Sequence, residues 1–234
     1  MLGGIVAREL NNRRSWTMRI TLILFAVVIA AGSALGETIA LPPVREDIEM
    51  SVIDAMGMRR TLRDYTDREV SEEDLATILW SAYGANRENG KKTVPVAIGV
   101  DYMRIYVARS DGAWKYIPET HELERVTDSD IRGEIGMQGF VSSANLVLVL
   151  VFDSSAYSLV FDIALSEESQ LGHGHATSGC TAQNVHLTCA AMDYGTCMIA
   201  MIKEGKIRKH LALEDKEIPL YIMPIGGVEE GSYD

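Results

Sequence analysis

The strongest constraint on the fold is an uninterrupted apolar run in the second half of the chain. Residues 145 to 152, NLVLVLVF, carry no charge and are rich in valine and leucine. A strand with one face in water alternates apolar and polar residues, so a continuous run of this length is typical of a strand buried on both faces. We therefore expect a layered fold with this strand inside it.

The patterns around this run predict further elements. Ser71 with Asp74 three residues later resembles a capping box, and Gly84 provides a stop for the helix between them. Asp111-Gly112 stands between the alternating sequences RIYVA and WKYI, which predicts a β-hairpin. We also expect helices over residues 46–58, 127–136, 156–168, 176–194 and 203–212, a long loop over 85–101 and a last strand over 218–226.

This mixture of helices, a hairpin and single strands indicates an α+β fold in one domain, with no internal repeat.

An apolar segment near the N-terminus has the composition of an export signal. Residues 20 to 31, ITLILFAVVIAA, follow several arginines and precede the small-residue sequence Ala34-Leu35-Gly36. We interpret residues 1–36 as a signal peptide cleaved before Glu37, leaving residues 37–234 as the domain, in the periplasm or otherwise outside the cytoplasm. The alternative is an uncleaved anchor, and only then would the protein associate with a membrane.

The sequence from Asn12 to Met18, NRRSWTM, resembles a twin-arginine export signal, a route that moves folded proteins. An ordinary charged region before the apolar segment is the alternative. If Met18 is the true start of the protein, the arginine pair is lost.

The mature domain is strongly acidic. Residues 37–234 hold 18 basic and 32 acidic residues, a net charge of −14, which argues against nucleic acid as a partner. Three cysteines, Cys180, Cys189 and Cys197, lack the spacing of a zinc site and are interpreted as small buried residues.

Against this acidic background, one arginine cluster stands out where a helix is expected to end: Arg59-Arg60-Thr61-Leu62-Arg63. The planar fork of arginine donates paired hydrogen bonds to a phosphate, and a threonine hydroxyl adds another. The alternative is that these cations only complement the dipole of the preceding helix.

A second pattern, His173-Gly174-His175, could chelate a metal ion, but no third ligand has suitable spacing. A polar loop before a helix is the preferred interpretation, and we predict no metal site.

Several short motifs in order along the chain resemble the nitroreductase superfamily of flavoproteins. The segment Arg59, Thr61, Arg63 and Tyr65 is similar to the family's opening R-x-S-x-R-x-F motif, and GANRENGKKTVP is similar to its second segment. Further matches are Gly136, Gln138, Phe140, Val141, Ala144 and Asn145-Leu146-Val147, then Gly179, Gln183-Asn184, Leu187, Ala190 and Gly195, and finally Ile225-Gly226-Gly227.

The resemblance implies a nitroreductase-like α+β fold, with a central, mainly antiparallel sheet flanked by helices, in a homodimer that binds FMN. The residues expected to bind FMN by position are Arg59, Arg60, Thr61, Arg63, Pro95, Val96, Ala97, Gln138 and Gly226. Gln138 would offer its amide to the flavin pyrimidine. The equally weighted alternative is that Gln138 satisfies backbone groups at a helix end. No catalytic side chain is expected, because flavin chemistry belongs to the cofactor.

The function implied is an FMN-dependent oxidoreductase. It would transfer hydride by a ping-pong scheme from NAD(P)H or another donor to a small organic acceptor such as a nitroaromatic or a quinone. Two departures support an alternative, an exported non-catalytic binding module with weak or absent flavin binding. The family's Pro-Ser-x-x-Asn is here Pro95-Val96-Ala97-Ile98-Gly99, and the Lys or Arg after the last strand is replaced by Val228-Glu229-Glu230.

Overall fold

The computed structural model describes residues 36–233, so the predicted export segment lies outside the described residues. From Thr38 onward the chain forms one compact unit built on a seven-stranded sheet. None of the helices in this described part is both long and apolar enough to cross a membrane.

The apolar run forms the centre of the sheet. Strand β5 (Leu146–Asp153) is buried along its whole length and lies between β2 (Met103–Arg109) and β7 (Glu217–Gly227). The strand order is β1-β4-β3-β2-β5-β7-β6, and every pairing is antiparallel. The remaining strands are β1 (Thr38–Ala40), β3 (Gly112–Ile117), β4 (Glu122–Thr127) and β6 (Tyr194–Thr196). The expected α+β fold with an antiparallel sheet is confirmed.

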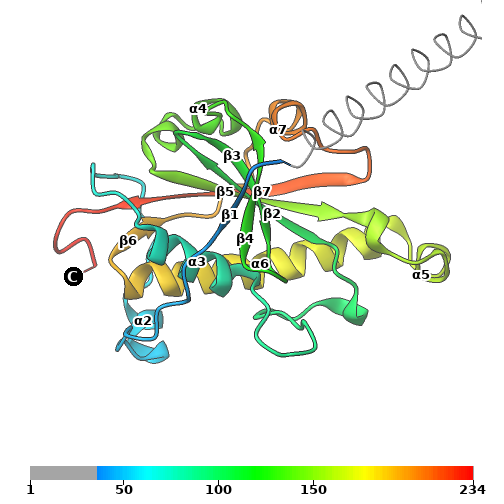
Figure 1. Ribbon diagram of the computed structural model, residues 1–234, viewed down its shortest axis with the longest axis horizontal. Helices are drawn as coiled ribbons and strands as arrows, with labels where there is room; N and C mark the ends of the chain where they lie inside the picture. The colour runs from blue at the N-terminus through cyan, green and yellow to red at the C-terminus, as the bar shows by residue number, and fades with distance from the viewer. Residues whose placement is uncertain (1–35, 234) are drawn as a thin grey trace, which may run out of the picture. The chain divides into compact units, whose positions relative to one another are not determined.

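Helices cover both faces of this sheet (Figure 1). Helices α3 (Glu72–Tyr83) and α6 (Glu167–Ala191) share one apolar core with Leu148 and Leu150 of β5. On the other face, residues of α4 (Arg132–Ile135) and α7 (Glu204–His210) pack with Val147, Val149 and Val151. Because alternate β5 side chains enter the two cores, both faces of the strand must be apolar.

Short helices complete the described part of the chain. They are α2 (Val52–Met58), α5 (Leu159–Ala164) and the 3₁₀ turns η1 (Ala97–Gly99), η2 (Gly139–Ser143) and η3 (Ser154–Ala156).

The local signals around α3 and the hairpin are confirmed. The Ser71 hydroxyl accepts a hydrogen bond from the backbone N–H of Asp74 at 3.1 Å, and the helix ends at Gly84. Strands β2 and β3 turn at Asp111-Gly112. Gly112 has φ +137°, and a Cβ there would lie 2.2 Å from the Thr127 carbonyl oxygen. Only glycine therefore fits the turn.

The helix predicted over residues 46–58 is wrong in its first half, since α2 begins only after Ser51. The Ser51 hydroxyl accepts a bond from the Asp54 backbone N–H, which starts the helix there. Upstream, Arg45 reaches Asp47 and Asp74, and its backbone N–H bonds the Thr77 hydroxyl on α3. These contacts hold the preceding segment in a non-helical path along α3.

The predicted loop at His173-Gly174-His175 is also wrong, because these residues lie inside α6, which runs unbroken for 25 residues from its cap at Ser166. Gly174 is tolerated in the helix because it packs on the Phe152 ring, 2.8 Å from where a Cβ would stand. His173 Nδ1 bonds the Tyr157 hydroxyl and His175 Nδ1 bonds that of Tyr221, so the two rings have separate partners.

The helix predicted over residues 127–136 is reduced to the four residues of α4. The neighbouring strand β4 was not predicted, nor were the three-residue strands β1 and β6. Of the helix predicted over residues 156–168, only the six-residue α5 and the first two residues of α6 are α-helical. The helix over 203–212 and the last strand are confirmed as α7 and β7.

Candidate functional site

The arginine cluster runs along the β6–β7 edge of the sheet. After α2 ends, the Leu62 backbone N–H donates to the Thr196 carbonyl at 3.2 Å and the Thr66 N–H to the Gly227 carbonyl at 2.9 Å. The close approach depends on Gly226, where a Cβ would lie 3.0 Å from Tyr65. Gly226 is therefore covered by Tyr65 and shapes the site by letting this segment lie flat on β7.

Two arginines of the cluster have no carboxylate partner among the described residues. Neither Arg59 nor Arg63 forms an ion pair with another described residue, although the domain is rich in acidic groups. Most other arginines of the described part are paired, namely Arg45, Arg104, Arg109, Arg125, Arg132 and Arg208. Unpaired guanidinium groups in an acidic protein are suited to bind an anion from solution.

An aromatic ring and an unpaired amide lie at the Arg63 end of the cluster. The Arg63 guanidinium stands 6.0 Å from the centre of the Phe140 ring. Two residues earlier, Gln138 has a buried Oε1 atom with no hydrogen-bond partner in the described structure. Gln138 precedes η2 but makes no capping bond to it. The helix-end alternative for this side chain is therefore not observed, and the amide is available to a polar ligand.

The Cys197 thiol lies beneath the same segment and is buried. Burial raises the pKa of this thiol, and the neighbouring Arg63 and Tyr65 side chains only partly oppose the shift. The thiol therefore stays protonated at neutral pH, which makes it a packing group rather than a nucleophile.

A buried histidine lies at the Arg59 end of the cluster. His186, on α6, is 8% exposed, and its Nδ1 atom is buried without a partner among the described residues. Burial and the nearby positive charge of Arg59 lower the pKa of His186 to about 4. The ring is thus neutral at pH 7. Sequence reasoning missed this residue, although a single histidine among Ala182, Val185 and Cys189 on one helix face was a visible signal.

The Pro95–Ala97 loop meets α6 at a different point. The Pro95 carbonyl accepts a bond from the Thr177 hydroxyl at 3.2 Å, and the Ala97 backbone N–H donates to the Tyr102 hydroxyl at 2.9 Å. Thr177 and His186 are nine residues apart, about 13 Å along the helix axis. Within a single chain, the Pro95–Ala97 loop and the arginine cluster therefore lie at separate positions along α6.

The loop carries a strained backbone. Ile98 has φ +50°, a left-handed conformation that is rare for a β-branched residue, and its side chain is exposed. This geometry directs an apolar side chain outward beside Val96 and Ala97.

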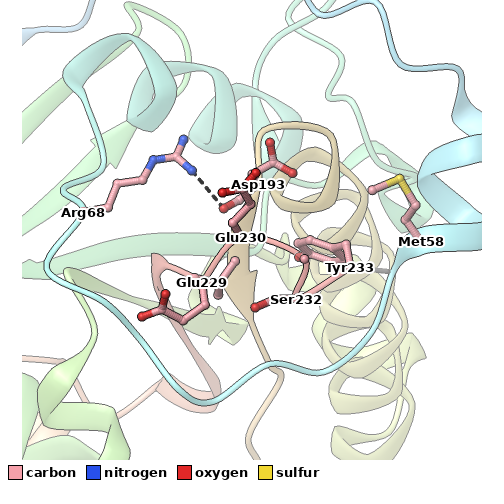
Figure 2. A pocket seen from close by; sticks show the side chains of 9 residues that line it. Met58, Arg68, Asp193, Glu229, Glu230, Ser232 and Tyr233 are labelled. Carbon is pink, nitrogen blue, oxygen red and sulfur yellow. Dashed lines mark hydrogen bonds between the residues drawn. The ribbon is translucent and has the colours of Figure 1, made fainter.

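A cavity of about 300 Å³ opens beside Met58, at the end of α2 (Figure 2). The C-terminal segment Val228–Tyr233 lines one side, and the Tyr233 hydroxyl donates to the Tyr194 carbonyl at 2.6 Å. Arg68 is bound to the carbonyls of Met192 and Asp193. Glu229 and Glu230 line its wall and have no ion-pair partner among the described residues, so their negative charges make this cavity a poor site for an anion.

The structure thus brings part of the predicted site together. Arg59, Arg60, Thr61 and Arg63 form one exposed or half-buried segment, with Gln138 near its end and Gly226 beneath it. Pro95, Val96 and Ala97 form a separate surface on α6.

Comparisons with known proteins agree with one another. The model of the nitroreductase family matches residues 56–227. A candidate nitroreductase of Methanocaldococcus jannaschii is 31% identical over 204 residues, which cover 82% of this chain and 98% of that protein.

Solved structures share the fold. A candidate nitroreductase from Ralstonia eutropha superposes with a TM-score of 0.76 at 26% identity, over 84% of this chain and 92% of its own. The NADPH:FMN oxidoreductase of Vibrio harveyi, solved with NAD⁺, superposes with a TM-score of 0.59 at 20% identity, over 78% and 71% of the two chains.

Proposed function

Because the chain belongs to the nitroreductase family of flavin-dependent oxidoreductases, we propose that it binds FMN and transfers hydride from a reduced donor to a small organic acceptor. The observation that carries this proposal is the pair of arginines without carboxylate partners, Arg59 and Arg63, at the two ends of a short segment. FMN carries a phosphate at one end and a polar ring at the other, so it matches a site with an anion-binding end and a ring-binding end.

The residues fit the two ends of this cofactor. Arg59 and Arg60 are adjacent cations suited to the phosphate, and the exposed Thr61 can add a hydroxyl donor. Arg63, with Phe140 and the unpaired Gln138 amide, suits the ring edge, which has both hydrogen-bond donors and acceptors.

Bound FMN would supply the redox chemistry, the transfer of a hydride from a donor such as NAD(P)H to an acceptor such as a nitroaromatic or a quinone. The protein residues hold and orient the reactants and exclude water. Because donor and acceptor would use the same open face in turn, we propose a ping-pong scheme.

A second copy of the chain would complete the site. Helix α6 exposes small residues on its outer side, Gly172, Ala176 and Gly179, which permit close helix packing. If two α6 helices cross antiparallel near residue 181, Thr177 of one copy lies beside His186 of the other. The Pro95–Ala97 loop of the second copy would then approach the arginine cluster, and on this basis we propose a homodimer with two shared sites.

Exposed apolar side chains on two short helices also support the dimer. Val52, Ile53 and Met56 of α2 and Leu159, Val160 and Ile163 of α5 face solvent in the single chain. Clusters of this kind mark surfaces that another protein covers.

The absorption spectrum of the purified protein tests the cofactor directly. We expect the bands of oxidised flavin, and release of FMN on denaturation. A colourless protein that does not take up added FMN would instead support a non-catalytic binding module, the alternative favoured by Glu229 and Glu230.

Steady-state kinetics test the reaction. With NADH or NADPH and a quinone or nitroaromatic acceptor, double-reciprocal plots at several acceptor concentrations should give parallel lines. Intersecting lines would contradict the ping-pong scheme and leave flavin binding to be judged by the spectrum alone.

A further inference from the structure

Acidic residues near the end of α2 would repel a phosphate bound there. The segment after β7 carries Glu229 and Glu230, and both line the cavity beside Met58. The arginines at the end of α2 must therefore bind a phosphate with help from another direction. The side of Arg59 that faces α6 holds a different group.

That group is the imidazole of His186. It is more than nine-tenths buried, its Nδ1 atom has no partner in the described structure, and its helix, α6, packs against α2, the helix that ends at Arg59. A buried polar atom without a partner costs roughly 1 to 3 kcal/mol, so a native chain that keeps one usually has a use for it.

We propose that His186 donates a hydrogen bond to the phosphate of FMN and so completes the anion site formed by Arg59 and Arg60. The inference rests on the proposed function. It gives His186 the phosphate-binding role that the family's Lys or Arg after the last strand would have. A neutral imidazole retains one N–H donor, so it binds a phosphate oxygen without the cost of burying a third positive charge.

The test compares two ligands that differ only in the phosphate. FMN and riboflavin are titrated into the full-length apoprotein, with flavin fluorescence as the readout. We expect the wild type to bind FMN far more tightly than riboflavin. His186→Leu should weaken FMN binding about tenfold to a hundredfold, the effect of losing a hydrogen bond to a charged group, and leave riboflavin binding unchanged.

Two further variants test the need for a hydrogen-bond donor and control for the substitution itself. His186→Gln retains a hydrogen-bond donor and should recover most of the FMN affinity. His210→Leu, the same substitution on α7 where the histidine bonds Glu134, is the matched control and should change neither ligand. If His186→Leu does not fold, His186→Phe replaces it, and the same selective loss of FMN affinity, with riboflavin binding unchanged, is expected.

The outcomes separate the two proposals. Equal weakening of FMN and riboflavin by a folded His186 variant, or no change in either, would overturn the role of His186 while leaving the flavoprotein function intact. A wild-type protein that binds neither ligand would overturn both.

Discussion

At the scale of single residues, Arg63 offers the sharpest test of the ring end of the site. Arg63→Ala removes one charge-assisted contact, which should cost roughly 1.5 to 3 kcal/mol of FMN binding, or one to two decades in dissociation constant. Titration of apoprotein with FMN measures this. Arg208→Ala, on α7 and paired with Glu204, is the control and should bind FMN as the wild type does. An unchanged dissociation constant for Arg63→Ala would remove this residue from the site.

Asp74 couples the stability of the domain to pH. Its carboxylate is nearly buried and accepts bonds from Arg45 at 2.6 Å and Tyr194 at 2.7 Å. Burial alone would raise the pKa of Asp74, but these hydrogen bonds outweigh it and lower the pKa below its usual value. A lowered pKa stabilises the fold above the unfolded-state pKa, and this contribution disappears as pH falls through the folded-state pKa.

We therefore expect Asp74→Asn to lower the free energy of unfolding by about 1 to 3 kcal/mol at pH 7 and by much less at pH 3. Urea denaturation at the two pH values provides the measurement. A difference between wild type and variant that stays the same at both pH values would show that the charge of Asp74 does not contribute.

At the scale of elements, the contact between α6 and β5 depends on Gly174. In Gly174→Ala the new methyl group would lie about 2.8 Å from the Phe152 ring, so we expect a destabilisation of roughly 1 to 3 kcal/mol. Gly205→Ala, on α7 and in open space, should instead stabilise its helix by about 0.5 to 1 kcal/mol. Thermal unfolding of both variants decides the matter, and equal melting temperatures would contradict the packing argument.

The elements that the sequence predicted well are those with strong local signals. Strand β5 was evident from its apolar run, α3 from Ser71 and Asp74, and the hairpin from Asp111-Gly112. The sequence did not reveal that α6 continues through Gly172 and Gly174, because the reason is the packing of a distant residue, Phe152. Strands β1 and β6 are only three residues long and exist through their partners in the sheet.

The candidate site was likewise predictable only where its residues form a local motif. The arginine segment was visible as a motif in an acidic chain. The single histidine on the apolar face of α6 was visible in the sequence, but its position near Arg59 follows from the packing of α2 on α6. The separation of the Pro95–Ala97 loop from the arginines also depends on where each meets α6, which no local pattern encodes.

At the scale of the whole molecule, we expect the mature protein to be an obligate homodimer. Light scattering at low micromolar concentration should report about twice the mass of the mature chain, as for an interface on the order of 2,000 Å². Gly179→Arg should dissociate the dimer, because the site of substitution is open on the exposed side of α6. A stable monomer of the wild type that retains FMN would contradict both the dimer and the shared site.

Export provides a second prediction at this scale. Small residues at Ala34 and Gly36 favour cleavage before Glu37. Mass spectrometry of protein recovered from outside the cytoplasm should therefore find a chain that begins at Glu37. Protein that retains residues 1–36 would instead be membrane-anchored.

The strand order has a consequence for the timing of biosynthesis. Strand β7 is the last of the described elements, yet it lies inside the sheet, between β5 and β6. Until β7 has left the ribosome, β5 has no partner on that side, so the sheet cannot close before residues 217–227 are available. Gly226 and the surface beneath the arginine cluster form in that same step. FMN would therefore bind only after β7 is in place, and a chain truncated before β7 would remain both unfolded and colourless.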